Sequence, residues 1–204
     1  MFTGPGKPCQ PNDPDEIFIR PTRTGDICVL LEPSNQTELK RLRQHQNALQ
    51  ARFGGQPAEV IHLTCQRFAI QREDQLNGLV ENLLESRNEV KPFPISAVSL
   101  SVLHEEYRDT NILKWCVQVT DDLLRFLVYI ENCLLASGIL PLQKSWFVPT
   151  LVTALVDSSN FDLENRLDGL KFPQYLYYAS QFQLSKICAP SEFEILTTIQ
   201  LLDA

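Results

Sequence analysis

The chain has 204 residues, of which 44% are hydrophobic and 21% charged, and its 25 acidic residues against 18 Lys and Arg give a formal net charge of −7. This composition is ordinary for a folded soluble protein and excludes a disordered or collagen-like chain. The acidic balance argues against a protein that coats duplex DNA, because such binding needs many Lys and Arg contacts to phosphates. No run of 18 apolar residues occurs and the N-terminus does not resemble a signal peptide, so we expect a cytoplasmic protein with no membrane partner.

The first 24 residues contain prolines at positions 5, 8, 11, 14 and 21. Proline lacks the backbone N–H that helices and sheets require, so residues 1–24 are predicted to form an arm outside the fold. A single domain is expected over residues 25–204. The six cysteines are scattered, without metal-binding spacing, and are interpreted as reduced, mostly buried thiols. No metal or cofactor is expected.

The first elements are a strand, a helix and a second strand. The apolar run at residues 27–31 predicts a buried strand, and Ser34 or Asn35 can cap a helix that ends at Phe53, before two glycines. Residues 60–70 follow as a strand with alternating faces. On one face we expect His62, Thr64, Gln66 and Phe68, and on the other Ile61, Leu63, Cys65 and Arg67.

The rest of the chain continues the alternation of strands and helices. Apolar periodicity predicts a helix over 73–86, strands over 93–103 and 113–119, and a helix from Thr120 or Asp121 to Gly138. The strand 146–156 comes next, then a polar, partly helical stretch around 160–170, and finally strands at 175–185 and 193–201.

The order strand, helix, strand occurs in residues 27–70 and again in 112–156. Such an internal repeat favours two similar lobes over one doubly wound parallel sheet. We therefore predict an α+β fold of two similar lobes of antiparallel sheet, with helices on the outer faces and a central cleft.

His62 and Thr64 are the most informative polar residues. Two apart on a strand, they point the same way, so an imidazole can handle a proton while a hydroxyl donates to a phosphate oxygen. A histidine that only fills a structural position would give the same local sequence. The residues around the pair separate these interpretations.

The sequence resembles the 2H phosphoesterases, in particular the 2′-5′ RNA ligase and cyclic phosphodiesterase branch, over nearly the whole chain after residue 24. The resemblance rests on Glu32-Pro33 after the first strand, on His62-Leu63-Thr64, on Gly138-Ile139 before the segment Trp146 to Ala154, and on the last two strands. It implies a metal-free site in which two His-x-Thr motifs, one from each lobe, act on a 2′,3′-cyclic phosphate or a related phosphodiester.

The resemblance is incomplete at the second motif. After Pro149, the family's histidine position is held by Thr150 and its threonine position by Val152. A threonine hydroxyl neither accepts nor releases a proton near neutral pH, although it can still hydrogen-bond to a phosphate. The predicted site is therefore His62 as the catalytic residue, with Thr64, Thr150 and Lys144 binding the substrate.

The sequence contains two further histidines and several aromatic residues that could belong to the same site. His45 is interpreted as a solvated helix residue, and His104 as the end of a strand near a turn. The tyrosines at 175, 177 and 178, together with Trp146, could stack on a base, but aromatic residues on strands more often pack within the sheet, and packing is the favoured interpretation.

The sequence leads to one main hypothesis and two alternatives. The main one is a divergent 2H-type protein that binds a nucleotide or RNA terminus with little or no turnover. The first alternative is an active cyclic phosphodiesterase or RNA ligase-like enzyme that uses His62 as its sole acid/base residue. The second alternative is a scaffold for protein partners, in which His62 is only packed.

Overall fold

The computed structural model describes residues 20, 22–105, 110–143, 148–149, 151–156, 167, 170–189 and 192–202. Its elements in chain order are β1 (Ile27–Leu31), α2 (Gln36–Phe53), β2 (Gln56–Pro57), β3 (Leu63–Phe68), α3 (Glu73–Glu85), the 3₁₀ turn η1 (Arg87–Glu89), β4 (Phe93–Glu105), β5 (Thr110–Val117), α4 (Asp121–Ala136), β6 (Leu151–Val156), β7 (Tyr175–Ala179), β8 (Gln181–Ala189) and β9 (Glu192–Gln200). The predicted α+β class is confirmed.

The helices begin where the sequence supplies caps. The Asn35 side chain accepts a hydrogen bond from the Thr37 amide at 2.8 Å and starts α2. Gly54, with φ of 77°, ends this helix in a conformation that favours glycine. At α4, the Thr120 hydroxyl accepts from the Leu123 amide at 3.2 Å. Both caps match the sequence prediction.

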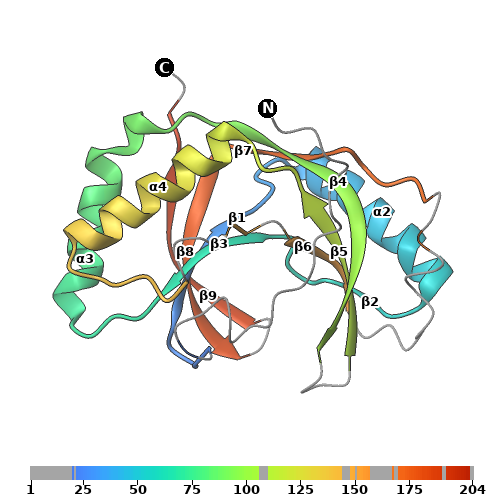
Figure 1. Cartoon of the computed structure of the whole chain (residues 1–204), viewed down its shortest axis with the longest axis horizontal. Coiled ribbons are helices and arrows are strands. Elements are labelled where there is room, and N and C mark those ends of the chain that lie inside the picture. Colours follow the sequence, from blue (N-terminus) through green and yellow to red (C-terminus); the bar gives the residue numbers. More distant parts are fainter. Residues whose placement is uncertain are drawn as a thin grey trace, which may run out of the picture.

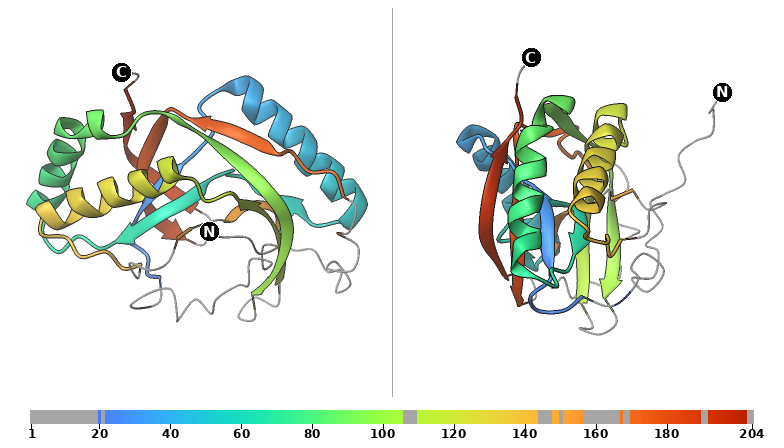
Figure 2. Two further views of the ribbon diagram at one scale, coloured as in Figure 1. Left: turned by 45° about the horizontal axis from the view of Figure 1, so that its top comes forward. Right: turned by 90° about the vertical axis from the view of Figure 1, so that its left-hand side faces the viewer.

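The strands form one antiparallel sheet in the order β7-β4-β5-β6-β3-β1-β8-β9, with β2 beside β6. The sheet is strongly curved, with α2 on one half and α3 and α4 on the other, as Figures 1 and 2 show. One hydrophobic core joins the helices to the sheet face beneath them. We call this face, which includes Leu63, Trp115 and Val152, the helix face of the sheet.

The predicted repeat is visible in the topology. In the first unit, α2 connects β1 to β3, and these two strands pair antiparallel. In the second unit, α4 connects β5 to β6, which also pair antiparallel. The units meet at the centre of the sheet, where Leu63 of β3 lies opposite Val152 of β6. Each helix packs beyond its own unit, since α2 contacts β6 and α4 contacts β3. The two halves are therefore interlocked.

The observed strands differ from the prediction at three places. The predicted strand 175–185 is two strands, β7 and β8, divided at Ser180 and paired with β4 and β1 in different parts of the sheet. β3 begins at Leu63, so His62 lies immediately before the strand. The short strand β2 was not predicted. Most of the predicted arm 1–24 and of the stretch 160–170 lies outside the described residues.

Candidate functional site

A bulge in β3 determines which side chains accompany Thr64. Thr64 lies opposite Leu30 of β1, but Gln66 lies opposite Val29, so one residue of β3 is inserted between the two pairs. Directly opposed residues share a face, and Val29 belongs to the core. Gln66 therefore lies on the helix face.

The predicted alternation of this strand is thus wrong beyond Cys65. Arg67 lies opposite Cys28 and shares the face of Thr64, whereas Gln66 and Phe68 do not. The inserted residue shifts the two-residue period by one position. From the bulge, the amide oxygen of Gln66 accepts hydrogen bonds from the Arg67 amide at 2.9 Å and the Gln143 amide at 3.3 Å.

His62 is half-buried, and its ring contacts Phe193 edge-on, with 5.2 Å between the ring centroids. Its Nδ1 lies 3.2 Å from the Val60 carbonyl oxygen. Because a carbonyl only accepts, Nδ1 carries the proton and Nε2 keeps its lone pair. Burial lowers the pKa of His62 to about 4, with a smaller lowering by the charge of Lys114. The imidazole is therefore a neutral proton acceptor near pH 7.

The centre of the sheet brings further polar groups to His62. Leu63 and Val152 are opposed and buried on the helix face, so their neighbours in sequence belong to the opposite face. Thr153 of β6 lies opposite Lys114 of β5 on that face. Continued by one residue, the β3–β6 register places His62 opposite Thr153. The effect of Lys114 on the pKa of His62 agrees with this placement.

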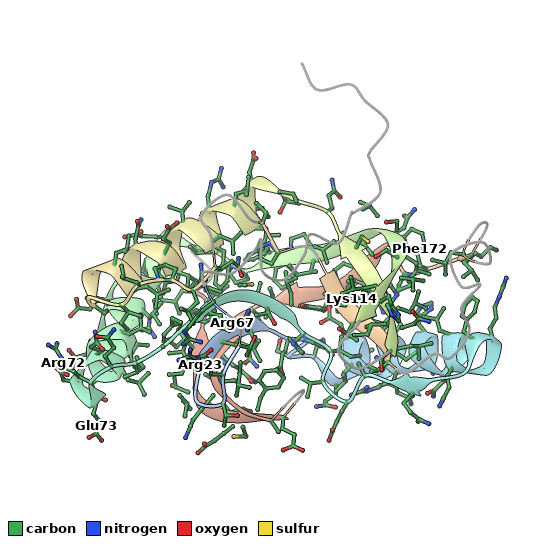
Figure 3. The ribbon with its side chains drawn as sticks, turned by 60° about the horizontal axis from the view of Figure 1, so that its bottom comes forward. Arg23, Arg67, Arg72, Glu73, Lys114 and Phe172 are labelled. Atoms are coloured by element: carbon green, nitrogen blue, oxygen red, sulfur yellow. The ribbon has the colours of Figure 1, made fainter. Side chains whose placement is uncertain are left out.

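Four polar side chains thus share the centre of one sheet face, and each is half-buried: His62, Thr64, Lys114 and Thr153. Figure 3, which brings the lower side of Figure 1 forward, labels Lys114 on β5 and Arg67 on β3 near the middle of the sheet. A cation, two hydroxyls and a neutral imidazole are suited to a phosphate ester, since hydroxyls and ammonium groups donate to its oxygens. We call these four residues the central site.

Further polar groups lie beside the central site on the same face. Arg67 is 5% exposed, and its pKa is lowered by burial, an effect partly offset by Cys28 and Asp26. Beyond β1, Gln183 lies opposite Leu30 and Ser185 opposite Cys28. Among the described residues, the Gln183 amide oxygen and the Ser185 hydroxyl are buried without a hydrogen-bond partner. This part of the face therefore has unused hydrogen-bonding capacity.

The predicted site residues are only partly described. His62 and Thr64 lie together on the expected face, whereas Thr150, Lys144 and Trp146 lie outside the described residues. Val152, assigned to the family's threonine position, is fully buried on the helix face, so it does not accompany Thr64. Lys114 and Thr153 were missed. The sequence did contain a signal for Thr153, because this polar residue stands between the apolar residues Val152 and Ala154 on a predicted strand.

The remaining candidates lie elsewhere. His45 is half-buried on α2, and burial lowers its pKa. His104 is exposed, with Nδ1 3.0 Å from the Asn111 side-chain oxygen. Tyr177 is fully buried and donates to the Leu31 carbonyl at 2.9 Å, while Tyr175 and Tyr178 donate to Glu38 and to the Pro92 carbonyl. Tyr177 is therefore part of the core, whereas Tyr175 and Tyr178 are exposed and hydrogen-bonded at the surface.

The described part of the chain offers little evidence for a reactive cysteine or a metal-binding site. Four of its cysteines are buried, and burial raises the pKa of Cys28, the one nearest Arg67, to about 12. No group of three His, Cys, Asp or Glu side chains there could hold a metal ion. None of the described helices has the length and hydropathy of a membrane span.

Comparison with known proteins identifies the fold. No family model and no curated protein sequence matches the chain. Solved structures do: E. coli LigT with 3′-AMP has a TM-score of 0.57 at 16% identity, covering 89% of this chain and 100% of LigT. A structure described as a phosphoesterase gives 0.56 at the same identity and coverage. Kluyveromyces marxianus Usb1 with uridine monophosphate gives 0.51 at 11% identity, covering 87% of this chain and 98% of that one. The chain therefore has the fold of LigT and of the structure described as a phosphoesterase.

Proposed function

We propose that the central site binds a phosphate-bearing ligand, a nucleotide or an RNA end, and turns over phosphodiesters slowly or not at all. The observation that carries this proposal is the gathering of His62, Thr64, Thr153 and Lys114 on one sheet face, in the fold of proteins whose structures contain 3′-AMP and uridine monophosphate. The proposal assigns the phosphate to the two hydroxyls and the ammonium group.

Binding follows from the donors of the central site. Thr64 and Thr153 can each donate one hydrogen bond to a phosphate oxygen, and Lys114 adds a charge-assisted donor. Neutral His62 offers a lone pair at Nε2, so it can accept a proton from a ligand hydroxyl. A phosphate next to the ring would favour the imidazolium and raise the pKa of His62 from its low value.

Turnover needs more than these groups. In-line displacement at phosphorus uses one group to remove a proton and another to supply one, each typically contributing about 10²- to 10⁴-fold. His62 can serve as one of them. At the His-x-Thr spacing from Thr153 the sequence has Leu151, and an aliphatic side chain transfers no proton. The loss of one partner removes on the order of 3–5 kcal/mol of transition-state stabilisation.

The test measures binding and turnover on the same protein. The wild type is titrated with 3′-AMP by calorimetry and incubated with 2′,3′-cyclic AMP. We expect measurable 3′-AMP binding that Lys114→Gln weakens, and hydrolysis at most slightly above the uncatalysed rate. The control is His104→Gln, because His104 is exposed and hydrogen-bonded within the β4–β5 hairpin. Unchanged affinity in Lys114→Gln would contradict the proposed site.

A second candidate function is an active phosphodiesterase that uses His62 as its sole acid/base residue. A neutral imidazole beside a cation favours it, since the lone pair can accept a proton while Lys114 stabilises developing charge. Rapid hydrolysis of 2′,3′-cyclic AMP that is lost in His62→Gln would select this function over the binding protein. If neither binding nor hydrolysis is detected, a scaffold for protein partners becomes the preferred hypothesis.

A further inference from the structure

The helix face carries a cavity that the central site does not use. Leu49 and Ala48 of α2, Trp115 of β5, and Phe172 and Pro173 before β7 line it, and its volume is about 470 Å³. Figure 3 labels Phe172 in the half of the molecule that contains α2. A volume of this size lies within the range of small-molecule sites. Its walls are aromatic, cyclic and aliphatic, so they suit a flat apolar body.

The cavity and the central site lie on opposite faces of the sheet. Trp115 shares the helix face with Val152, whereas Lys114, the preceding residue, belongs to the opposite face. Consecutive residues on a strand point to opposite sides of the sheet. A ligand in this cavity therefore occupies a different site from a phosphate at the central site, and the two binding events can be measured separately.

The indole of Trp115 lies directly behind the wall of the cavity. Trp115 is fully buried, and its Nε1–H has no hydrogen-bond partner among the described residues. Because the ring has no exposed surface, a ligand in the cavity does not reach this N–H, but the indole is close enough to report on occupancy of the cavity.

The rim of the cavity is basic. Arg52 and Lys171, both exposed, line it together with His45, and none of its described lining residues is acidic. Burial lowers the pKa of His45, so this ring is neutral near pH 7 and the rim charge comes from the other two. A concentration of positive charge is notable on a chain with a net charge of −7. The rim therefore complements an anionic group.

We infer that this cavity binds an aromatic carboxylate, with the ring against Phe172 and Leu49 and the carboxylate at the rim near Arg52 and Lys171. The inference does not depend on the proposed function, since no residue of the central site lines the cavity.

The probe is 2-naphthoate, followed through the indole N–H resonances of the ¹⁵N-labelled full chain. The sequence has two tryptophans, so Trp146→Phe assigns the Trp115 signal. We expect 2-naphthoate to shift this signal in a saturable manner. The neutral analogue 2-naphthalenemethanol should bind several-fold more weakly, because it lacks the charge that the rim complements.

Variants distinguish binding in the cavity from nonspecific binding to the protein surface. Replacing both cations, Arg52→Gln with Lys171→Gln, should weaken 2-naphthoate binding roughly tenfold while leaving the neutral analogue unchanged. Lys186→Gln removes an exposed cation on β8 and should have no effect. Ala48→Phe should block binding by filling the cavity. The inference is overturned by an unmoved Trp115 signal at roughly 1 mM probe, or by binding that survives Ala48→Phe.

Discussion

The two strands that meet at the centre of the sheet carry related triplets. His62-Leu63-Thr64 leads into β3, and Leu151-Val152-Thr153 opens β6. The middle residues, Leu63 and Val152, are opposed and fully buried on the helix face, and the two threonines are half-buried on the opposite face. The triplets therefore match in the buried residue and the hydroxyl and differ in the residue that could carry a proton.

From this comparison we propose that the second motif lies one residue further along the chain, at residues 151–153 instead of 150–152. The sequence pattern assigned the family's histidine position to Thr150 and its threonine position to Val152. Two antiparallel strands with Leu63 opposite Val152 are related by a local two-fold axis, so Thr153 of β6 corresponds to Thr64 of β3, although Thr153 lies opposite His62. A slip of one residue exchanges the two faces of a strand, so the two alignments assign different residues to the site. In the alignment given by the register, one threonine hydroxyl is retained and the histidine is replaced by a leucine.

The largest expected effect comes from restoring the missing proton carrier. Leu151→His gives β6 the His-x-Thr spacing of His62 and Thr64. We expect hydrolysis of 2′,3′-cyclic AMP to rise by about 10²-fold or more, because a second acid/base group typically contributes 10²- to 10⁴-fold. The measurement is initial rate against pH, which should become bell-shaped.

Thr150→His is the matched comparison, since it follows the alignment read from sequence alone. It should leave the rate near that of the wild type if the register decides the motif. A gain of activity in Thr150→His, with none in Leu151→His, would show that the second motif lies at residues 150–152 and that the correspondence between the two triplets is wrong.

The second prediction concerns the histidine that only one triplet has. The pKa of His62 is about 4 in the folded protein and about 6.5 in an unfolded chain. The folded state favours the neutral ring, so the contribution to stability is full above pH 6.5 and is lost as the pH falls towards 4. About 2–3 kcal/mol of unfolding free energy should disappear over this interval.

Urea unfolding at pH 7.5 and pH 4.5 measures this loss. His62→Gln cannot titrate, so its stability should fall less between the two pH values than that of the wild type. His104→Gln, which removes a histidine outside the central site, should retain the wild-type loss if that loss belongs to His62. Equal pH dependence in the wild type and His62→Gln would mean that the ring is solvated.

The third prediction tests how β6 is held. Gln46 of α2 is fully buried and donates from Nε2 to the Ala154 carbonyl at 2.9 Å, while its amide oxygen accepts from Arg43 at 2.8 Å. Gln46→Leu removes both of these bonds, while the Ala154 carbonyl keeps its bond from the Ala58 amide and Arg43 keeps its bonds to the Ala58 and Glu59 carbonyls. The variant should therefore lower the unfolding free energy by about 1–2 kcal/mol. Gln50→Leu, which loses a part-buried bond to the Gly55 carbonyl, should cost less. Similar costs for both variants would show that the bond to β6 has no special weight.

Much of the fold could be predicted from sequence because its signals are local. Caps at Asn35 and Thr120 and the apolar periodicity of the helices need no knowledge of distant residues. Strand partners are not local, so the division of residues 175–185 at Ser180 was missed. The same limit applies to the site. His62 and Thr64 are a short-range pattern, but Arg67 joins their face only through the bulge opposite β1, and Lys114 and Thr153 only through pairing.

The smallest expected effect tests whether the two hydroxyls are equivalent. Thr64→Val and Thr153→Val each remove one donor at nearly constant volume. Each should weaken 3′-AMP binding about fivefold, since a net hydrogen bond contributes about 1 kcal/mol. The double variant should lose roughly the product of the two effects if both hydroxyls contact the same phosphate independently. Thr198→Val, at an exposed position of β9 opposite Gln183, is the control. A loss confined to Thr64→Val would restrict phosphate binding to the β3 triplet, because β6 would then contribute neither a proton carrier nor a donor.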